Sequence, residues 1–199
     1  MTLVELSIAL AITGLIGAAV CSFTFATGTA WRSNEAGVTA EQLANLTSIR
    51  VNNAVQTARL FGACSSGNID DPSQAPYAAV MMWTRDRNAD GRIQTSEILL
   101  LEFDPANSRL NMWMKPAPKI DETWTYAAFT ASSAVDTMKL RSNRYTMISG
   151  LSAAQLALQT GAGANGRPTL AYQFRTRVGG AVESFTGAAA IRAPSAIPQ

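Results

Sequence analysis

Histidine is absent from this chain of 199 residues, and charged residues and cysteines are scarce. Without histidine the chain lacks the commonest general base and the commonest zinc ligand, which excludes hydrolase triads and histidine-based metal sites. Only 15% of the residues are charged, against roughly 25% in an average soluble domain, so some stretch is unusually apolar. A net charge of +2 is too small to indicate a nucleic-acid partner.

The apolar stretch lies at the N-terminus, where 18 of the first 26 residues are apolar and Glu5 is the only charged side chain before Arg32. A bilayer-spanning helix needs about 20 apolar residues, so this stretch is long enough to cross a membrane. It lacks the basic start and the short, bounded apolar core of a secretory signal peptide, and we expect no further removal of it. Trp31 and Arg32 are suited to a membrane interface.

Glu5 is the unusual residue in this stretch, because a carboxylate at membrane depth costs a few kcal/mol unless a partner is supplied. The α-amine of Met1 is a cation with a pKa of about 8. A neighbouring copy, shifted along the helix axis, could present its Met1 amine to Glu5 and so fix the register between copies, because a wrong register leaves a buried charge unpaired. The alternative is an ordinary membrane anchor whose Glu5 side chain reaches the interface.

The N-terminal residues also carry a resemblance to a known family. The mature N-terminus of type IV pilins and pseudopilins is similar to Met1-Thr2-Leu3-Val4-Glu5-Leu6, followed here by Ser7-Ile8-Ala9-Leu10-Ala11-Ile12. The resemblance covers residues 1–30 only, and it departs from the commoner pattern in having Met instead of Phe at position 1. It implies that a prepilin peptidase exposes Met1, that Met1 is N-methylated, and that Glu5 is the assembly glutamate.

The same resemblance implies a route and a destination. The bacterial chain would wait in the inner membrane as a single-pass intermediate. The pilus assembly machinery would then build it into an extracellular filament, a pilus or fimbrium, on the cell surface.

The apolar segment is expected to be the first part of a longer helix. No proline occurs before Pro72, and apolar residues alternate with polar ones at helical spacings up to Leu60. We therefore predict three segments: an apolar half that protrudes (1–30), an amphipathic helical half packed on a head (31–62) and a β-rich globular head (63–199). Residues 61–67 are predicted to end the helix with a glycine cap. Gly14 and Gly17 predict local unwinding, or close packing between copies.

The head is predicted to be an antiparallel sheet. Apolar runs of strand length occupy 77–83, 98–103 and 110–114. We also predict a hairpin that is formed by 170–178 and 182–191, with its turn at 179–180. Short helices are predicted within 122–140 and at 153–159. The fold class is therefore α+β, with a long N-terminal helix and an antiparallel sheet in a type IV pilin-like layout.

The two cysteines are not expected to pair within one chain. An unbroken helix places residue 21 roughly 60 Å from residue 60, whereas the Cα atoms of a disulfide lie within about 7 Å of each other. We expect Cys21 to be an apolar helix residue and Cys64 to be a free thiol. The C-terminal disulfide of many pilins has no counterpart here, since no cysteine follows Cys64.

A twelve-residue acidic loop matches the pattern of a calcium-binding loop, D-x-[DN]-x-[DN]-G-x5-E, at every required position. Its six candidate ligands are Asp86, Asn88, Asp90, Arg92 through its carbonyl, Gln94 and Glu97. The flanking runs are strands, which predicts a calcium loop at a hairpin tip, where Ca²⁺ would order the loop. The alternative is a solvated acidic turn without metal.

Three functions remain open from the sequence. The first is a structural pilus subunit, a helical homopolymer held together by its N-terminal helices. The second is a minor pilin or pseudopilin of a type II secretion or DNA-uptake system, and the third is a membrane-anchored, calcium-dependent binding module. Catalysis is not expected, because histidine is absent and the carboxylates concentrate in the acidic loop.

Overall fold

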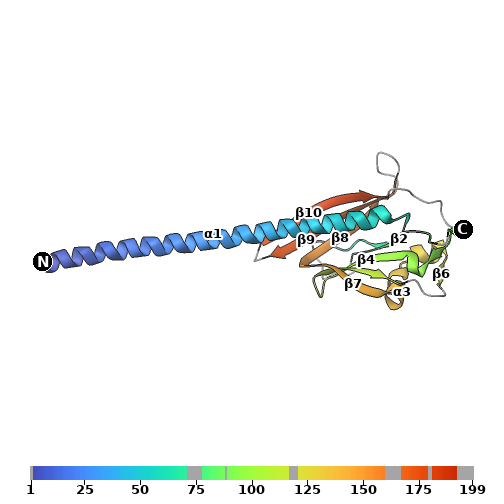
Figure 1. The fold of residues 1–199 in the computed structure, drawn as a ribbon, viewed down its shortest axis with the longest axis horizontal. Helices are drawn as coiled ribbons and strands as arrows, with labels where there is room; N and C mark the ends of the chain where they lie inside the picture. The colour runs from blue at the N-terminus through green and yellow to red at the C-terminus, as the bar shows by residue number, and fades with distance from the viewer. Residues whose placement is uncertain are drawn as a thin grey trace.

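The computed structural model describes residues 2–70, 78–87, 89–116, 121–159, 167–178 and 181–191. One helix, α1 (Leu3–Thr57), projects far beyond a head of antiparallel strands, as Figure 1 shows. The predicted α+β class, with a long apolar N-terminal helix and antiparallel sheets, is confirmed.

The helix α1 begins at a capping box. The hydroxyl of Thr2 accepts the N–H of Glu5 at 3.4 Å, and the Glu5 carboxylate accepts the N–H of Thr2 at 2.8 Å. These two bonds satisfy donors that a helix start otherwise leaves unpaired. The helix then runs unbroken through Gly14 and Gly17, so the predicted local unwinding is not present between Leu3 and Thr57. Close packing between copies at these glycines stays a prediction.

The predicted end of the helix was wrong. α1 ends at Thr57, Ala58 is extended, and β1 (Leu60–Ser65) follows where residues 61–67 had been predicted to cap the helix. The second predicted segment, 31–62, is therefore not helical throughout. Gly62 does not cap the helix but makes room for the ring of Phe129, since a Cβ there would lie 2.7 Å from that ring. A close approach between β1 and a helix of the head requires this glycine.

Five strands form the larger sheet, in the order β1-β2-β4-β5-β7, all antiparallel. The remaining four are β2 (Ala79–Trp83), β4 (Ile98–Asp104), β5 (Arg109–Met114) and β7 (Asn143–Ser149). The predicted strands at 77–83, 98–103 and 110–114 are confirmed, although Tyr77 lies outside the described residues. β7 was missed because its first four residues are exposed, which hides the apolar alternation of a strand.

Three strands form a second sheet in the order β10-β9-β8, with β8 (Leu151–Gln159), β9 (Thr169–Val178) and β10 (Ala181–Ala190). The predicted hairpin of β9 and β10 is confirmed, and its turn at 179–180 lies outside the described residues. The short helix predicted at 153–159 was wrong. Pairing with β9, for example Ala154 with Phe174, overrides the helical preference of its alanines and leucines.

Short elements complete the head. They are β3 (Ile93–Gln94), the 3-10 helix η1 (Thr95–Glu97), β6 (Thr123–Trp124), α2 (Tyr126–Thr130) and α3 (Ala134–Arg141). β3 and β6 pair to form a two-stranded ribbon. The predicted short helix within 122–140 corresponds to α2 and α3.

The core has two layers. Val51 and Val55 of α1 pack against residues from both sheets, such as Leu101 and Phe174. The other face of the larger sheet is covered by α2 and α3, and Phe129 of α2 is fully buried there. The head thus holds only the last part of α1, and all described residues before Ala36 are exposed.

Candidate assembly helix and acidic loop

The apolar part of α1 has no covering layer. Leu3, Phe23 and Trp31 are 86%, 72% and 73% exposed, and the mean hydropathy of the most apolar 18-residue window is 2.1. By length and composition this helix can cross a membrane. Residues 3–35 extend about 50 Å at 1.5 Å per residue, which is more than a bilayer's hydrocarbon core of about 30 Å. An apolar surface of this size requires lipid or protein around it.

The hydroxyl groups on this half are satisfied within the helix. From Ser7 to Thr29, each hydroxyl donates to a backbone carbonyl three or four residues earlier, as Thr13 does to Ala9 at 2.8 Å and Thr24 to Val20 at 2.8 Å. The six hydroxyls that do so belong to Ser7, Thr13, Ser22, Thr24, Thr27 and Thr29. Because none of these hydroxyls needs water, they do not oppose burial of the helix in an apolar environment.

Glu5 and Arg32 mark the two ends of the uncharged stretch. They are separated by about 40 Å along the helix, close to the full thickness of a bilayer with its headgroups, about 40–45 Å. Within its own chain Glu5 already accepts the N–H of Thr2. A carboxylate has two oxygens with about four acceptor sites, so this bond leaves capacity for a cation of another chain. Met1 itself lies outside the described residues.

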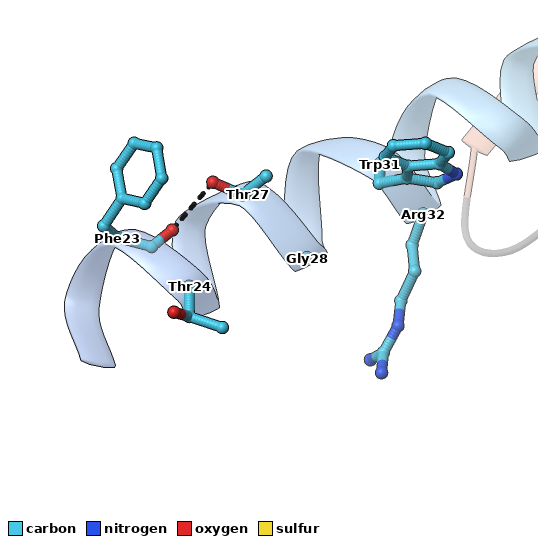
Figure 2. Close-up of a pocket in the computed structure, with 6 residues that line it drawn as sticks. All are labelled: Phe23, Thr24, Thr27, Gly28, Trp31 and Arg32. Carbon is cyan, nitrogen blue, oxygen red and sulfur yellow. Dashed lines mark hydrogen bonds between the residues drawn. The ribbon is translucent and has the colours of Figure 1, made fainter. Parts of the chain in front are cut away.

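The segment before Arg32 is shown in Figure 2. Phe23, Thr27 and Trp31 form one ridge along the helix, whereas Thr24 and Arg32 point to the other side. Gly28 lies in the same row as Thr24 and Arg32, and a Cβ added there would have no atom of the head or of another side chain within 4 Å. The result is a shallow groove along the helix, with a tryptophan and an arginine at its head-proximal end. This is the arrangement expected of a helix leaving a bilayer.

The acidic loop joins β2 to β4 at the end of their hairpin, as predicted. The Asp86 carboxylate accepts the N–H groups of Asp90 and Gly91, at 3.1 and 2.8 Å. Asp90 in turn accepts the N–H of Arg92 at 2.9 Å and the side-chain amide of Gln94 at 3.0 Å. The loop therefore closes upon its own carboxylates. The predicted ligand Asn88 lies outside the described residues.

The last predicted ligand, Glu97, is turned into the head. It is only 2% exposed, and its two oxygens accept from the indole N–H of Trp83 at 3.0 Å and the backbone N–H of Arg87 at 2.5 Å. Among the described residues, no lysine or arginine side chain forms an ion pair with it. Within the described part of the chain, this buried carboxylate is thus held by two neutral donors and has no positive side chain beside it to compensate its charge.

The described part of the chain contains no group of three His, Cys, Asp or Glu residues arranged to hold a metal ion. Asp86, Asp90 and Glu97 share one loop, but the structure does not gather them into such a group. Calcium binding thus stays a prediction that rests on the sequence pattern.

Both cysteines are free, Cys21 on the apolar half and Cys64 on β1. Although part of the Cys64 residue is exposed, desolvation by the surrounding head raises the pKa of its thiol from 9.0 to about 11. A backbone hydrogen bond from Leu158 offsets a little of this rise. Cys64 is therefore a protonated, weakly reactive thiol at neutral pH.

A second buried carboxylate was missed by the sequence reasoning. Glu102 of β4 is 5% exposed and pairs with the ammonium of Lys139 on α3 at 2.5 Å. It also accepts the indole N–H of Trp113 at 2.6 Å. A glutamate inside the apolar run 98–103 was the available signal, because a charge in a buried strand requires a partner. This pair ties α3 to the sheet.

No family model, curated protein or solved structure matches this chain.

Proposed function

We propose that this chain is the structural subunit of an extracellular type IV pilus-like filament. The observation that carries the proposal is the exposed apolar half of α1, which stands out from a folded head as part of one continuous helix. In a helical homopolymer these helices pack against one another in the filament core, and the β-rich heads lie outside. The layout of helix and sheets is consistent with a pilin-like fold.

The surface of the helix supports packing between copies. Gly14, Gly17, Cys21, Thr24 and Gly28 follow one another at spacings of three and four residues. Such spacing places all five along one side of a helix, as in a coiled-coil seam. Small residues at a helix interface let two backbones approach closely, which is how apolar helices associate in the absence of a hydrophobic driving force.

Glu5 is proposed to set the register between copies. Its carboxylate pairs with the Met1 amine of a neighbouring chain while it keeps its capping bond to Thr2. In an apolar bundle, any other register leaves two buried charges unpaired, which costs several kcal/mol.

Before assembly the chain is proposed to reside in the inner membrane as a single-pass intermediate, with Glu5 and Arg32 near opposite headgroup regions. A prepilin peptidase exposes Met1, and the pilus assembly machinery lifts the subunit into the filament. The apolar half then leaves the lipid and packs against neighbouring helices, so little of its apolar surface becomes exposed to water.

Replacement of Glu5 tests this proposal. We expect Glu5→Ala to abolish filaments in material sheared from cells, as seen by electron microscopy, while the head stays folded and the chain stays in membranes. Glu35→Ala is the matched control, since Glu35 is an exposed glutamate on the same helix, outside the apolar stretch. Abundant normal filaments from Glu5→Ala would refute the role of Glu5.

The minor pilin or pseudopilin function shares the same assembly chemistry, and the abundance of this chain in sheared filaments distinguishes it. A simple membrane anchor also fits the spacing of Glu5 and Arg32. In that case Glu5→Ala and wild type would behave alike, and neither would yield filaments.

A calcium site in the acidic loop is a second proposal, and Glu97 favours it. A buried carboxylate without a basic side-chain partner among the described residues gains from a cation. Asp86 and Asp90 lie on the same loop, and extracellular Ca²⁺ fills even weak sites. The role would be structural, to order the loop at the tip of the hairpin. The same loop would serve the third open function, a membrane-anchored, calcium-dependent binding module.

A further inference from the structure

A hollow lies on the head where α1 ends. It has a volume of about 560 Å³, and its apolar floor comes from Leu99 of β4 and Met114 of β5, which are paired neighbours in the sheet. Its walls come from the end of α1 with the residues that follow it and from the segment after β2. The wall residues are Gln56, Thr57, Ala58, Arg59, Thr84 and Arg85. The size is within the range of small-molecule sites, roughly 300–1,000 Å³.

Two arginines, Arg59 and Arg85, lie in the wall of the hollow. Among the described residues, neither Arg59 nor Arg85 forms an ion pair, whereas Arg141, Arg144 and Arg175 of the same head each do. Arg59 lies over the ring of Trp83, 6.0 Å from its centroid. Stacking on an aromatic ring holds a guanidinium in place and leaves its N–H donors available. The hollow therefore offers two cationic groups to a ligand.

The walls are fixed before any ligand binds. The backbone N–H and the hydroxyl of Thr84 both donate to the carbonyl of Glu97, at 2.9 and 3.0 Å. The backbone N–H of Arg59 donates to the carbonyl of Trp83 at 2.7 Å. A wall held in this way loses little conformational freedom on binding, which favours affinity.

Hydrogen-bond acceptors stand beside the two cations. The last carbonyl groups of a helix have no N–H partner four residues ahead. At the end of α1, the carbonyls of Ala54 and Val55 already accept the Thr57 hydroxyl and the Ala58 N–H, at 2.7 and 3.0 Å. The carbonyls of Gln56 and Thr57, two residues of the wall, are therefore the acceptors that the helix end offers, and the side-chain amide of Gln56 adds a further polar group. A simple anion would use the arginines alone and would be repelled by the carbonyls. A ligand with one carboxylate and several hydroxyl groups can use both.

We propose that this hollow binds a hydroxylated carboxylic acid, namely a hexuronic acid, either free or as a unit of an acidic polysaccharide. Its carboxylate pairs with Arg85 and Arg59, and its hydroxyls donate to the carbonyls at the end of α1. The apolar face of the sugar ring lies on Leu99 and Met114. This inference concerns the head alone and does not depend on filament assembly.

Methyl NMR of the full chain tests the proposal. The protein is labelled with ¹³C-methyl methionine, kept in a detergent without a sugar headgroup, and titrated with glucuronate. We expect the Met114 signal to shift saturably, since Met114 is 37% exposed on the floor of the hollow, while the buried Met81 and Met82 signals stay in place. Glucose and acetate at the same concentration should not shift it.

Arginine variants provide a second test of glucuronate binding. Arg85→Ala removes a charge-assisted pair and should weaken glucuronate binding about tenfold or more. Arg177→Ala is the control, because Arg177 is an exposed arginine on β9 outside the hollow, and binding should stay within about twofold of wild type. A polymer of glucuronate can contact several copies of the chain at once. If it binds more tightly than free glucuronate, the ligand of the hollow is a unit of an acidic polysaccharide.

Three results would overturn the proposal. The first is an unmoved Met114 signal at saturating glucuronate. The second is an equal shift with acetate or glucose, which would show that the hollow does not require a carboxylate and hydroxyl groups in the same ligand. The third is an equal loss of binding in Arg85→Ala and Arg177→Ala, which would mean attraction by bulk charge.

Discussion

The two halves of α1 share one helix but owe their structure to different surroundings. From Ala36 onward, the helix has buried positions such as Ala40, and it packs Val51 and Val55 against the sheets of the head. Before Ala36, every described residue is exposed, although the composition is more apolar. The head stabilises only the second half by burial. The first half is a helix by local capping and backbone bonding, and its apolar surface is left for lipid or another copy.

The largest expected effect comes from the same charge placed on each half. Val51→Asp buries a carboxylate in a site with no accessible surface and should cost more than about 3 kcal/mol, enough to unfold the head. Leu15→Asp changes a residue that is 72% exposed and should leave the thermal midpoint of the head unchanged. Near-UV circular dichroism of the full chain in detergent measures both.

Leu15→Asp should instead weaken membrane insertion, by about 3 kcal/mol. A fall in head stability with Leu15→Asp would break the comparison, because it would mean that the exposed half contacts the head.

Glycine substitutions test the same contrast through packing. Gly62→Ala places a Cβ 2.7 Å from the Phe129 ring and should destabilise the head by about 1–3 kcal/mol. Gly28→Ala meets nothing within 4 Å and should strengthen the isolated helix by up to about 1 kcal/mol. Gly62→Ala should lower the thermal midpoint of the head, whereas Gly28→Ala should leave that midpoint unchanged and raise only the helix signal in far-UV circular dichroism. A neutral Gly62→Ala would contradict the close approach of β1 and α2.

Calcium should act on the head alone. At ten times its dissociation constant, Ca²⁺ should stabilise the head by about 1.4 kcal/mol, visible as a raised thermal midpoint that a chelator reverses. Glu97→Gln should remove this response, whereas Glu183→Gln on the exposed β10 should keep it. An identical midpoint with Ca²⁺ and with chelator in the wild type would show the loop to be a metal-free turn.

The smallest effect concerns the Cys64 thiol of the head. Its pKa of about 11 predicts that alkylation of a Cys21→Ser variant speeds up about tenfold per pH unit from pH 8 to pH 10. Because the folded thiol ionises less readily than an unfolded one, head stability should be full below pH 9 and decline between pH 9 and about 11. A labelling rate that levels off near pH 9 would show that the head does not desolvate the thiol.

The sequence predicted those parts of the fold where one local signal dominates. The N-terminal helix follows from uninterrupted apolar composition, and the β9–β10 hairpin follows from alternation around a glycine pair. The strands β1 and β8 were missed because their local sequence patterns are typical of a helix cap and of a helix, respectively. Only long-range pairing, of Leu60 with Trp83 and of Ala154 with Phe174, makes them strands.

The candidate site shows the same division. The order of acidic residues in the loop was visible in the sequence, and the structure places the loop at the predicted hairpin tip. The burial of Glu97 against Trp83 was not predictable, because it depends on how β2 and β4 come together. The hollow beside Arg59 and Arg85 was equally hidden, since it exists only because α1 ends over the sheet.

The most direct test of the central claim is electron cryomicroscopy of filaments sheared from cells that produce this chain, with peptide mass spectrometry of the same material. The account predicts uniform filaments in which this chain is the dominant protein, with residues 3–35 packed as helices in the core and the heads outside. A chain found only in the membrane fraction, with no filament containing it, would contradict the account.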